Sequence, residues 1–303
     1  MKNPVPALRP PHRGSLSRKK TLTGYAFILP NLTGFALMTL VPLLFSFVLG
    51  FCEWDSANPI EWRGLQNYID LFGDKYFRAS ILNTIYYTVA IVPTTMILSL
   101  VLAIALNSKI RFRNLFRTVY FFPYVVSTMI VCIVWNILFF PGMGPVNSLL
   151  SALGVENLPR WSADAKWAMP TVIGVGIWQS MGYYMIVYLA ALQGIPPELY
   201  EAAALDGAGS WAKFRYITWP SLRATNFFVM IMLTIGGFNV FDQVFMLTEG
   251  GPGRSSYVIV YYMYEKAFRS YKFGYASAMG TILFLIIFII ILIQFRVNKK
   301  QET

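Results

Sequence analysis

The polar, alanine-rich segment 196–222 separates two long apolar stretches, and its residue types suit contact with another protein. Pro196 and Pro197 stand where a helix can begin, because proline has no N–H group that the first turn would need. Three consecutive alanines follow, and alanine has the best helix propensity. The pair Asp206-Gly207 then ends the run, because glycine readily adopts the left-handed conformation that closes helices.

A second short helix is predicted over Trp211 to Ile217. Ser210 can cap its start, and the residue before Pro220 disfavours helix, so we expect the helix to stop there. The segment then forms a helix, a sharp turn and a helix on a membrane surface, with small side chains that let another backbone approach. An ordinary cytoplasmic loop can also hold two short helices, so this pattern alone does not assign a function.

A second group of polar residues lies in the apolar stretch 224–247. Gly236, Asn239 and then Asp242 and Gln243 are spaced at i, i+3 and i+6/i+7, which puts them on or near one face of a continuous helix. Polar groups are costly in lipid, so this face should look into the helix bundle or into a wet cavity, where it could bind a ligand. A hydrogen bond between helices, or an acid at the outer interface, is the alternative for Asp242.

A comparable face is predicted in the stretch 168–192. It contains Gln179, Gly182, Tyr183 and Ile186, with Trp178 beside it. Aromatic rings can stack on the C–H surfaces of a bound ligand such as a sugar, which makes this face a second candidate for ligand binding. In membrane proteins, however, tyrosine and tryptophan commonly belong to interfacial belts or to packing.

Other kinds of site are disfavoured by the residues that the sequence has. The only histidine, His12, lies in the N-terminal tail, so we expect no histidine-based metal site. Cys52 and Cys132 are placed too differently for a disulfide between them. The sequence has no G-x-x-x-x-G-K-[ST] motif, so it should not bind ATP through a phosphate loop.

Six membrane-spanning helices must position these residues. Hydrophobic residues make up 56% and charged residues 13% of the chain, about half the charged share of a soluble domain. The mean hydropathy is +0.53, and several apolar runs exceed the roughly 20 residues that cross a bilayer. The sequence therefore predicts an all-α, polytopic membrane protein. The predicted spans are 24–51, 81–106, 116–140, 168–192, 224–247 and 274–295, and the first is interrupted by Pro30 and Pro42.

The distribution of charge predicts the orientation of the chain. Of the 25 basic residues, 16 fall on the side of the two termini and the segment 196–222, six of them in residues 1–22. The nine on the other side are matched by nine acids. The positive-inside rule therefore places both termini in the cytoplasm. The net charge of +11 follows from this asymmetry and needs no nucleic acid as partner.

Segment 196–222 closely resembles the EAA loop of permease subunits in binding-protein-dependent ABC importers. The matching residues are Glu201, Ala202, Ala203, Asp206, Gly207, Ala208, Ile217 and Pro220. Other stretches resemble the carbohydrate-uptake branch, with its maltose-type and glycerol-phosphate-type permeases. These are 64–68 with Leu71-Phe72, Asn83-Thr84, Phe122-Pro123-Tyr124, Trp135, 144–147, Phe241-Asp242 and 248–252.

The resemblance implies an ABC transmembrane type-1 architecture. It divides the chain into a cytoplasmic tail 1–22, a first helix and outer loop 23–78, a five-helix core 79–296 with coupling loop 194–222, and a tail 297–303. The chain itself would be non-catalytic and hold no cofactor, with ATP and Mg bound by the partner ATPase. A second, related permease subunit, two ATPase subunits and an extracytoplasmic sugar-binding protein would complete the importer in a prokaryotic inner membrane.

In this family mechanism, outer loops 52–79, 141–167 and 248–273 receive sugar from the binding protein. Closure of the ATPases then moves the EAA helices, with Glu201 facing the ATPase and Gly207 providing the bend. The same machine could carry glycerol phosphate, a polyamine or a peptide, although we find no basic residue well inside the spans. An ion-coupled secondary transporter would need paired or relayed ionisable groups at the midplane, and a membrane enzyme a catalytic constellation. The sequence supports neither.

Overall fold

The computed structural model describes residues 18–108 and 110–300, and most of these residues are helical. Four helices are long and apolar enough to cross a membrane, and two bent helix pairs raise the number to six. The predicted all-α membrane fold is therefore confirmed, and the predicted six spans are reached when each bent pair counts as one span. Residues 1–17 and 301–303 of the two predicted tails, His12 included, lie outside the described residues.

The first span is one long helical rod. It consists of α1 (Arg18–Phe35), a π-helical segment η1 (Ala36–Leu40) and α2 (Val41–Leu49). The two prolines do not interrupt it as predicted: Pro30 lies inside α1, and Pro42 lies in the first turn of α2, where its missing N–H is not needed. The rod then ends at a short antiparallel ribbon of β1 (Cys52–Glu53) and β2 (Glu61–Trp62).

The next elements are α3 (Gln66–Gly73) and the second span, α4 (Lys75–Asn107), which is longer at its start than predicted. Asp74 begins α4 by accepting a hydrogen bond from the Tyr76 backbone N–H at 2.8 Å. Asn67, from one of the matched motifs, is buried and donates to the carbonyl oxygens of Gly50 (3.0 Å) and Cys52 (2.8 Å). This motif side chain thus holds the ribbon against α3.

The third span is not a single straight helix. It consists of α5 (Arg113–Val125) and α6 (Thr128–Leu138), whose axes differ by 100°. Residues 126 and 127 are extended between them, after Pro123 in the last turn of α5. The predicted continuous span 116–140 is therefore wrong in shape. Helix α7 (Pro145–Ala152) and a 3₁₀ turn η2 (Trp161–Ala163) follow in the loop.

The fourth span matches its prediction to within one residue. It is α8 (Ala168–Gln193), which packs most extensively against α4 and also contacts α5 and α12. The segment that follows contains α9 (Pro197–Leu205), α10 (Ser210–Lys213), a π-helical segment η3 (Phe214–Thr218) and α11 (Trp219–Ser221).

The last two spans differ from each other in regularity. The fifth is broken into α12 (Arg223–Phe238) and α13 (Asp242–Leu247). It leads to α14 (Ile259–Tyr264), a π-helical segment η4 (Glu265–Arg269) and the sixth span, α15 (Phe273–Lys300). The predicted sixth span, 274–295, lies within α15.

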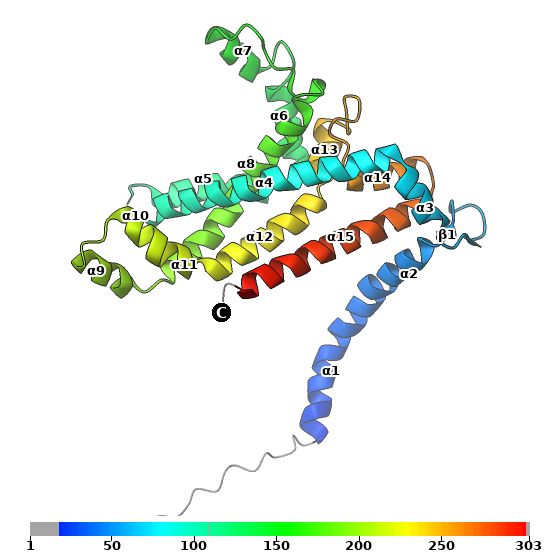
Figure 1. Cartoon of the computed structure of the whole chain (residues 1–303), viewed down its shortest axis with the longest axis horizontal. Coiled ribbons are helices and arrows are strands. Elements are labelled where there is room, and N and C mark those ends of the chain that lie inside the picture. Colours follow the sequence, from blue (N-terminus) through cyan, green and yellow to red (C-terminus); the bar gives the residue numbers. More distant parts are fainter. Residues whose placement is uncertain (1–17, 109, 301–303) are drawn as a thin grey trace, which may run out of the picture.

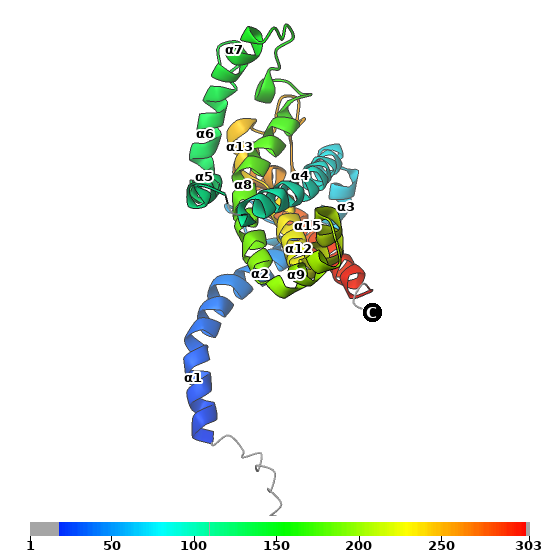
Figure 2. The ribbon, with the colours of Figure 1, turned by 90° about the vertical axis from the view of Figure 1, so that its left-hand side faces the viewer.

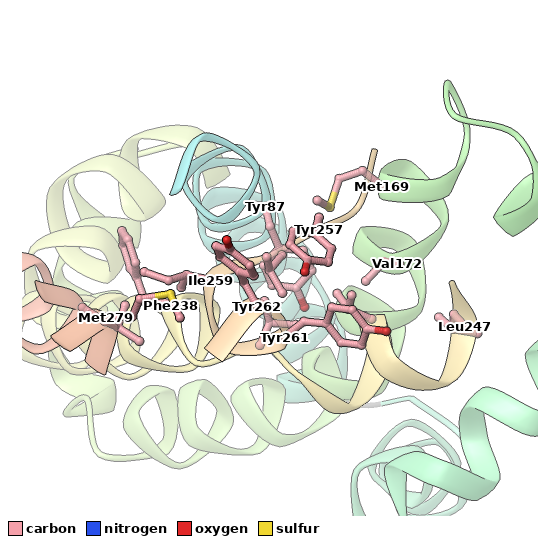
Figure 3. Packing of buried hydrophobic residues seen from close by; sticks show 14 of the residues in the cluster. Tyr87, Met169, Val172, Phe238, Leu247, Tyr257, Ile259, Tyr261, Tyr262 and Met279 are labelled. Carbon is pink, nitrogen blue, oxygen red and sulfur yellow. The ribbon is translucent and has the colours of Figure 1, made fainter. Parts of the chain in front are cut away.

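Two clusters of buried side chains hold the helices together. The larger gathers residues of α4, α8, α12, α14 and α15, and Figure 3 shows Tyr257, Tyr261 and Tyr262 lying together in it near Tyr87. The smaller lies toward the other end and centres on Tyr188 and its neighbours in α8. Figure 1 places α9 and α10 at one end of the molecule and β1, α3 and α14 at the opposite end. We call these the coupling end and the ribbon end.

Two parts of the chain extend away from this body. The rod formed by α1, η1 and α2 leaves it on one side, and α6 with α7 leaves it on another (Figures 1 and 2). Only 6% of the rod's apolar window is buried, compared with 56% of that in α8. The rod contacts the rest of the chain mainly where α2 meets α15.

Candidate functional site: a coupling segment and a polar break in a span

The turn after α9 has a regular hydrogen-bonded geometry. Gly207 has φ +78° and donates its N–H to the Ala204 carbonyl oxygen at 3.1 Å. The Ala208 N–H reaches back to the Ala203 carbonyl oxygen at 2.8 Å. These two bonds form a Schellman motif, in which the left-handed residue is usually glycine. The bend predicted at Gly207 is therefore present.

The residues of the family motif fall into two groups, one exposed and one packed against the helix bundle. Glu201, Ala202, Asp206 and Gly207 are exposed, and so is Leu205, of which 90% is accessible. Sequence reasoning missed Leu205, which directly follows the three alanines; an exposed leucine is a signal for protein contact.

The inner half of the segment anchors it to the helix bundle. Ile217 packs against the smaller core cluster together with Tyr200. The hydroxyl groups of Tyr200 and Thr218 are 2.9 Å apart, which connects α9 to η3. Ala203 and Ala208 are half-buried beneath the turn.

Two predictions about the second helix are wrong. Ser210 does not cap it, because Gly209 occupies the N-cap position and no side chain caps this end. The helical segment also continues past Pro220. The π-helical turn places the Trp219 N–H on the Phe214 carbonyl oxygen, so that Pro220 falls in the first turn of α11, where no N–H is required.

Two residues from the separately predicted polar faces meet. Gln243 of α13 donates through Nε2 to Gln179 Oε1 of α8 at 3.3 Å. Gln179 in turn donates to Thr128 Oγ1 of α6 at 3.1 Å. The structure thus joins three helices through neutral polar groups, and Thr128 is a member that sequence reasoning missed. Thr128 lies at the start of α6 beside a bend that was not foreseen.

The predicted face of the fifth span is only partly correct. Because α12 ends at Phe238 and α13 begins at Asp242, Gly236, Asn239 and Asp242 do not share one continuous helical face. Asn239 and Asp242 are both exposed beside the break. Asn239 donates to the Ile235 carbonyl oxygen at 2.8 Å. Irregular backbone at membrane depth is tolerated where it is buried in protein or lines a wet cavity, so this break is a candidate surface for solute.

Aromatic rings border the polar cluster. Trp178 packs edge-on against Trp135 at 5.4 Å between centroids, and Tyr183 stacks on Tyr124 at 4.5 Å. Trp178 is 36% exposed, which leaves ring surface for a ligand. Gly182, from the same predicted face, instead permits close packing, because a side chain there would overlap the Tyr120 carbonyl oxygen of α5. Ile186 is half-buried and packs with the smaller core cluster.

The described residues contain no group of three or more histidine, cysteine or acidic side chains that could hold a metal ion. Cys52 and Cys132 are both buried and free, as expected. The groups that the candidate site presents are hydroxyl, amide and aromatic groups and the Asp242 carboxylate.

Comparison with known proteins identifies the family. The family described as binding-protein-dependent transport system inner membrane component matches residues 95–303. The chain belongs to this family.

Relatives and a solved structure extend the match to nearly the whole chain. A probable ABC transporter permease protein, YurN of Bacillus subtilis, is 37% identical over 284 residues, covering 92% of this chain and 97% of its own. The lactose transport system permease protein LacF of Rhizobium radiobacter is 34% identical over 295 residues, covering 96% and 98%. A chain in the crystal structure of a bacterial ABC transporter for import of the acidic polysaccharide alginate has a TM-score of 0.80. It is 25% identical, with coverage of 93% and 96%.

The prediction of an ABC importer permease is confirmed by these matches. The chain is a multi-pass, non-catalytic membrane subunit, and ATP hydrolysis in such importers belongs to separate ATPase subunits.

Proposed function

We propose that the chain forms half of the translocation path of an importer for a neutral oligosaccharide. The observation that carries this proposal is the polar break between α12 and α13, where exposed Asn239 and Asp242 lie next to the Gln243–Gln179–Thr128 cluster. Amide and hydroxyl groups bind sugar hydroxyls, and the half-exposed Trp178 offers an apolar ring beside them.

The charge at this surface favours a neutral solute. Asp242 is exposed at the break, and an unpaired carboxylate there would repel a phosphorylated or acidic sugar. The related structure serves an acidic polysaccharide and LacF serves lactose. We assign this chain to the neutral class, because the amides and the hydroxyl at the break suit sugar hydroxyls and the acid disfavours an anionic solute.

We further propose the arrangement that the family resemblance implies. Both termini and the coupling end face the cytoplasm, with tails 1–22 and 297–303, a first helix and outer loop 23–78 and a core 79–296. The exposed half of the motif, including Glu201 and Leu205, docks on an ATPase subunit that binds ATP and Mg. A second permease subunit completes the path, and a sugar-binding protein docks on the outer loops 52–79, 141–167 and 248–273.

The test is uptake of radiolabelled sugars by cells that express the complete importer. Asn239→Ala, Gln243→Ala and Asp242→Asn should each weaken apparent affinity severalfold, because a neutral hydrogen bond contributes about 1 kcal/mol. Asn114→Ala is the control, since Asn114 is an exposed amide far from the break.

The outcome separates the possible roles of the cluster. Expression and ATPase association should stay normal in all four variants. Asp242→Asn should also improve transport of an acidic sugar relative to a neutral one. Normal transport by all three path variants would show that the break is only structural. Loss of expression would assign the polar groups to packing.

A further inference from the structure

Two arginines at the coupling end have buried donors without acceptors. Arg113 and Arg117 stand one turn apart on α5, and both side chains are half-buried. Nε and Nη2 of Arg113 and Nε of Arg117 are buried and donate no hydrogen bond to any described residue. A buried donor without a partner costs about 1–3 kcal/mol, and more when the group is charged.

No described carboxylate neutralises these two guanidinium groups. The ion pairs among the described residues join Arg63 to Glu53 and to Asp70, at the ribbon end. The acids of α9, at the coupling end, are exposed and make no ion pair with α5. A permanent positive charge with buried N–H groups is stabilised by an anion, and the described residues supply none.

The position of the two arginines suits the headgroup layer of a membrane. They begin the apolar third span, and the next residues along α5 include Leu115, Phe116 and Val119, all exposed. Arg113 and Arg117 share a face with Tyr120, which packs closely on Gly182 of α8. The site therefore has two cations on the side of α5 that includes Tyr120, with an apolar helix surface beside them, at the end of a membrane span.

We propose that Arg113 and Arg117 bind the phosphate of an anionic phospholipid in the inner leaflet. Guanidinium groups bind phosphate oxygens in bidentate geometry, and basic pockets between helices at the cytoplasmic face hold lipid headgroups. The exposed apolar side chains on α5 lie where acyl chains would follow the headgroup. The choice of leaflet rests on the orientation proposed above, but the presence of the lipid site does not.

The experiment uses the complete importer, purified and placed in nanodiscs with increasing fractions of phosphatidylglycerol in phosphatidylcholine. Bound phosphatidylglycerol is counted by native mass spectrometry, and ATPase activity stimulated by the binding protein is measured at each fraction. The variant is Arg113→Gln with Arg117→Gln. The control is Arg111→Gln with Lys299→Gln, which removes the same charge from two exposed residues.

The variant should lose one tightly bound phosphatidylglycerol, while the control keeps it. Its affinity for that lipid should fall about fivefold for each arginine, which corresponds to about 1 kcal/mol per basic residue at a membrane surface. Replacement of both residues by lysine should retain part of the binding, because the charge remains and the bidentate geometry is lost. Partial binding by the lysine variant would also show that the loss of lipid in the glutamine variant does not come from misfolding.

Three results would overturn the proposal. Equal lipid retention by the variant and the control would show that only general surface charge matters. Loss of the ATPase subunits from the variant in pure phosphatidylcholine would identify a carboxylate of the ATPase as the anion. Inorganic phosphate that replaces phosphatidylglycerol in supporting activity would identify a soluble anion. None of these results bears on sugar transport through the break at 239–241.

Discussion

Two glycines in α8 have opposite environments, and they show how strongly a single position can constrain packing. A side chain at Gly182 would overlap the Tyr120 carbonyl oxygen of α5, whereas a Cβ at Gly174 would meet no atom within 4 Å. Gly182→Ala should lower the thermal unfolding temperature of the chain in detergent, because overpacking typically costs about 1–3 kcal/mol. Gly174→Ala, in the same helix, should leave the unfolding temperature equal or raise it slightly, since alanine favours helix. Equal effects of the two changes would contradict the close α5–α8 contact.

At the coupling end, the exposed half of the motif should control assembly. Glu201→Lys and Leu205→Asp should each reduce the amount of ATPase that co-purifies with the permease, while membrane insertion stays normal. Glu198→Lys is the matched control, because Glu198 is an exposed acid in the first turn of the same helix. If Glu198→Lys and Glu201→Lys behave alike, the docking surface has been placed on the wrong face.

Gly207 offers a separate test of the turn. Gly207→Pro cannot adopt φ +78° and removes the N–H that bonds to Ala204. We expect ATPase co-purification and sugar uptake to fall together while the permease still inserts. Normal ATPase co-purification and normal sugar uptake in this variant would contradict the docking assignment.

Among the elements, straight helices were predictable and breaks were not. The span α8 was predicted to within one residue, because an apolar run of more than 20 residues has a strong signal whatever its neighbours are. The break at 239–241 has equally apolar flanks, and its partners are distant in the chain. Asn136 of α6 donates to the Met246 carbonyl oxygen at 2.8 Å, and Gln243 contacts Gln179, 64 residues away. No local spacing rule relates such residues.

The same limit applies to the candidate site. The turn at Gly207 could be predicted because its geometry is local, and so could the exposed acid Glu201. The meeting of Gln179 with Gln243 could not be predicted, although both residues were named separately. Thr128 was missed because a 100° bend between α5 and α6 precedes it, and α6 packs on α13, which is distant in the chain.

At the ribbon end, Asp74 joins three elements. Its Oδ2 accepts hydrogen bonds from Tyr262 of α14 and, at 2.8 Å, from Tyr275 of α15, while its carboxylate caps α4. Partial burial acts to raise the pKa of Asp74, but these hydrogen bonds outweigh it and the pKa lies below its ordinary value of 3.8. Burial and the Asp74 carboxylate raise the pKa of Tyr262, so its hydroxyl remains a donor.

This pKa shift predicts a pH dependence of stability. Because the pKa is lower in the folded state, the carboxylate stabilises the protein above about pH 4, and this contribution is lost as the pH falls toward the folded value. Thermal unfolding of the wild type should therefore lose more stability between about pH 6 and pH 3 than that of Asp74→Asn. Tyr262→Phe should give an intermediate slope, because it removes one donor. If thermal stability falls with pH in the same way in all three proteins, the Asp74 carboxylate is not a stabilising group.

For the whole molecule, the position of each end relative to the membrane is directly testable. Single cysteines at Ser56, Ser162 and Ser255 should react with a membrane-impermeant maleimide added outside intact spheroplasts. A cysteine at Ser210, at the coupling end, should react only after the membrane is opened. The native cysteines make a suitable background because both are buried. Labelling of Ser210 from outside would reverse the proposed orientation.

The exposed rod of α1, η1 and α2 affects how long an unassembled subunit survives in the cell. Of the four unbroken spans in the described residues, it is the one that the rest of the chain covers least. A helix with so few internal contacts is held by lipid until another protein packs on it, and it is the first to separate when that protein is missing. A subunit made in excess of its partners would therefore expose this rod to membrane proteases. Its lifetime in the membrane would then report whether assembly had occurred.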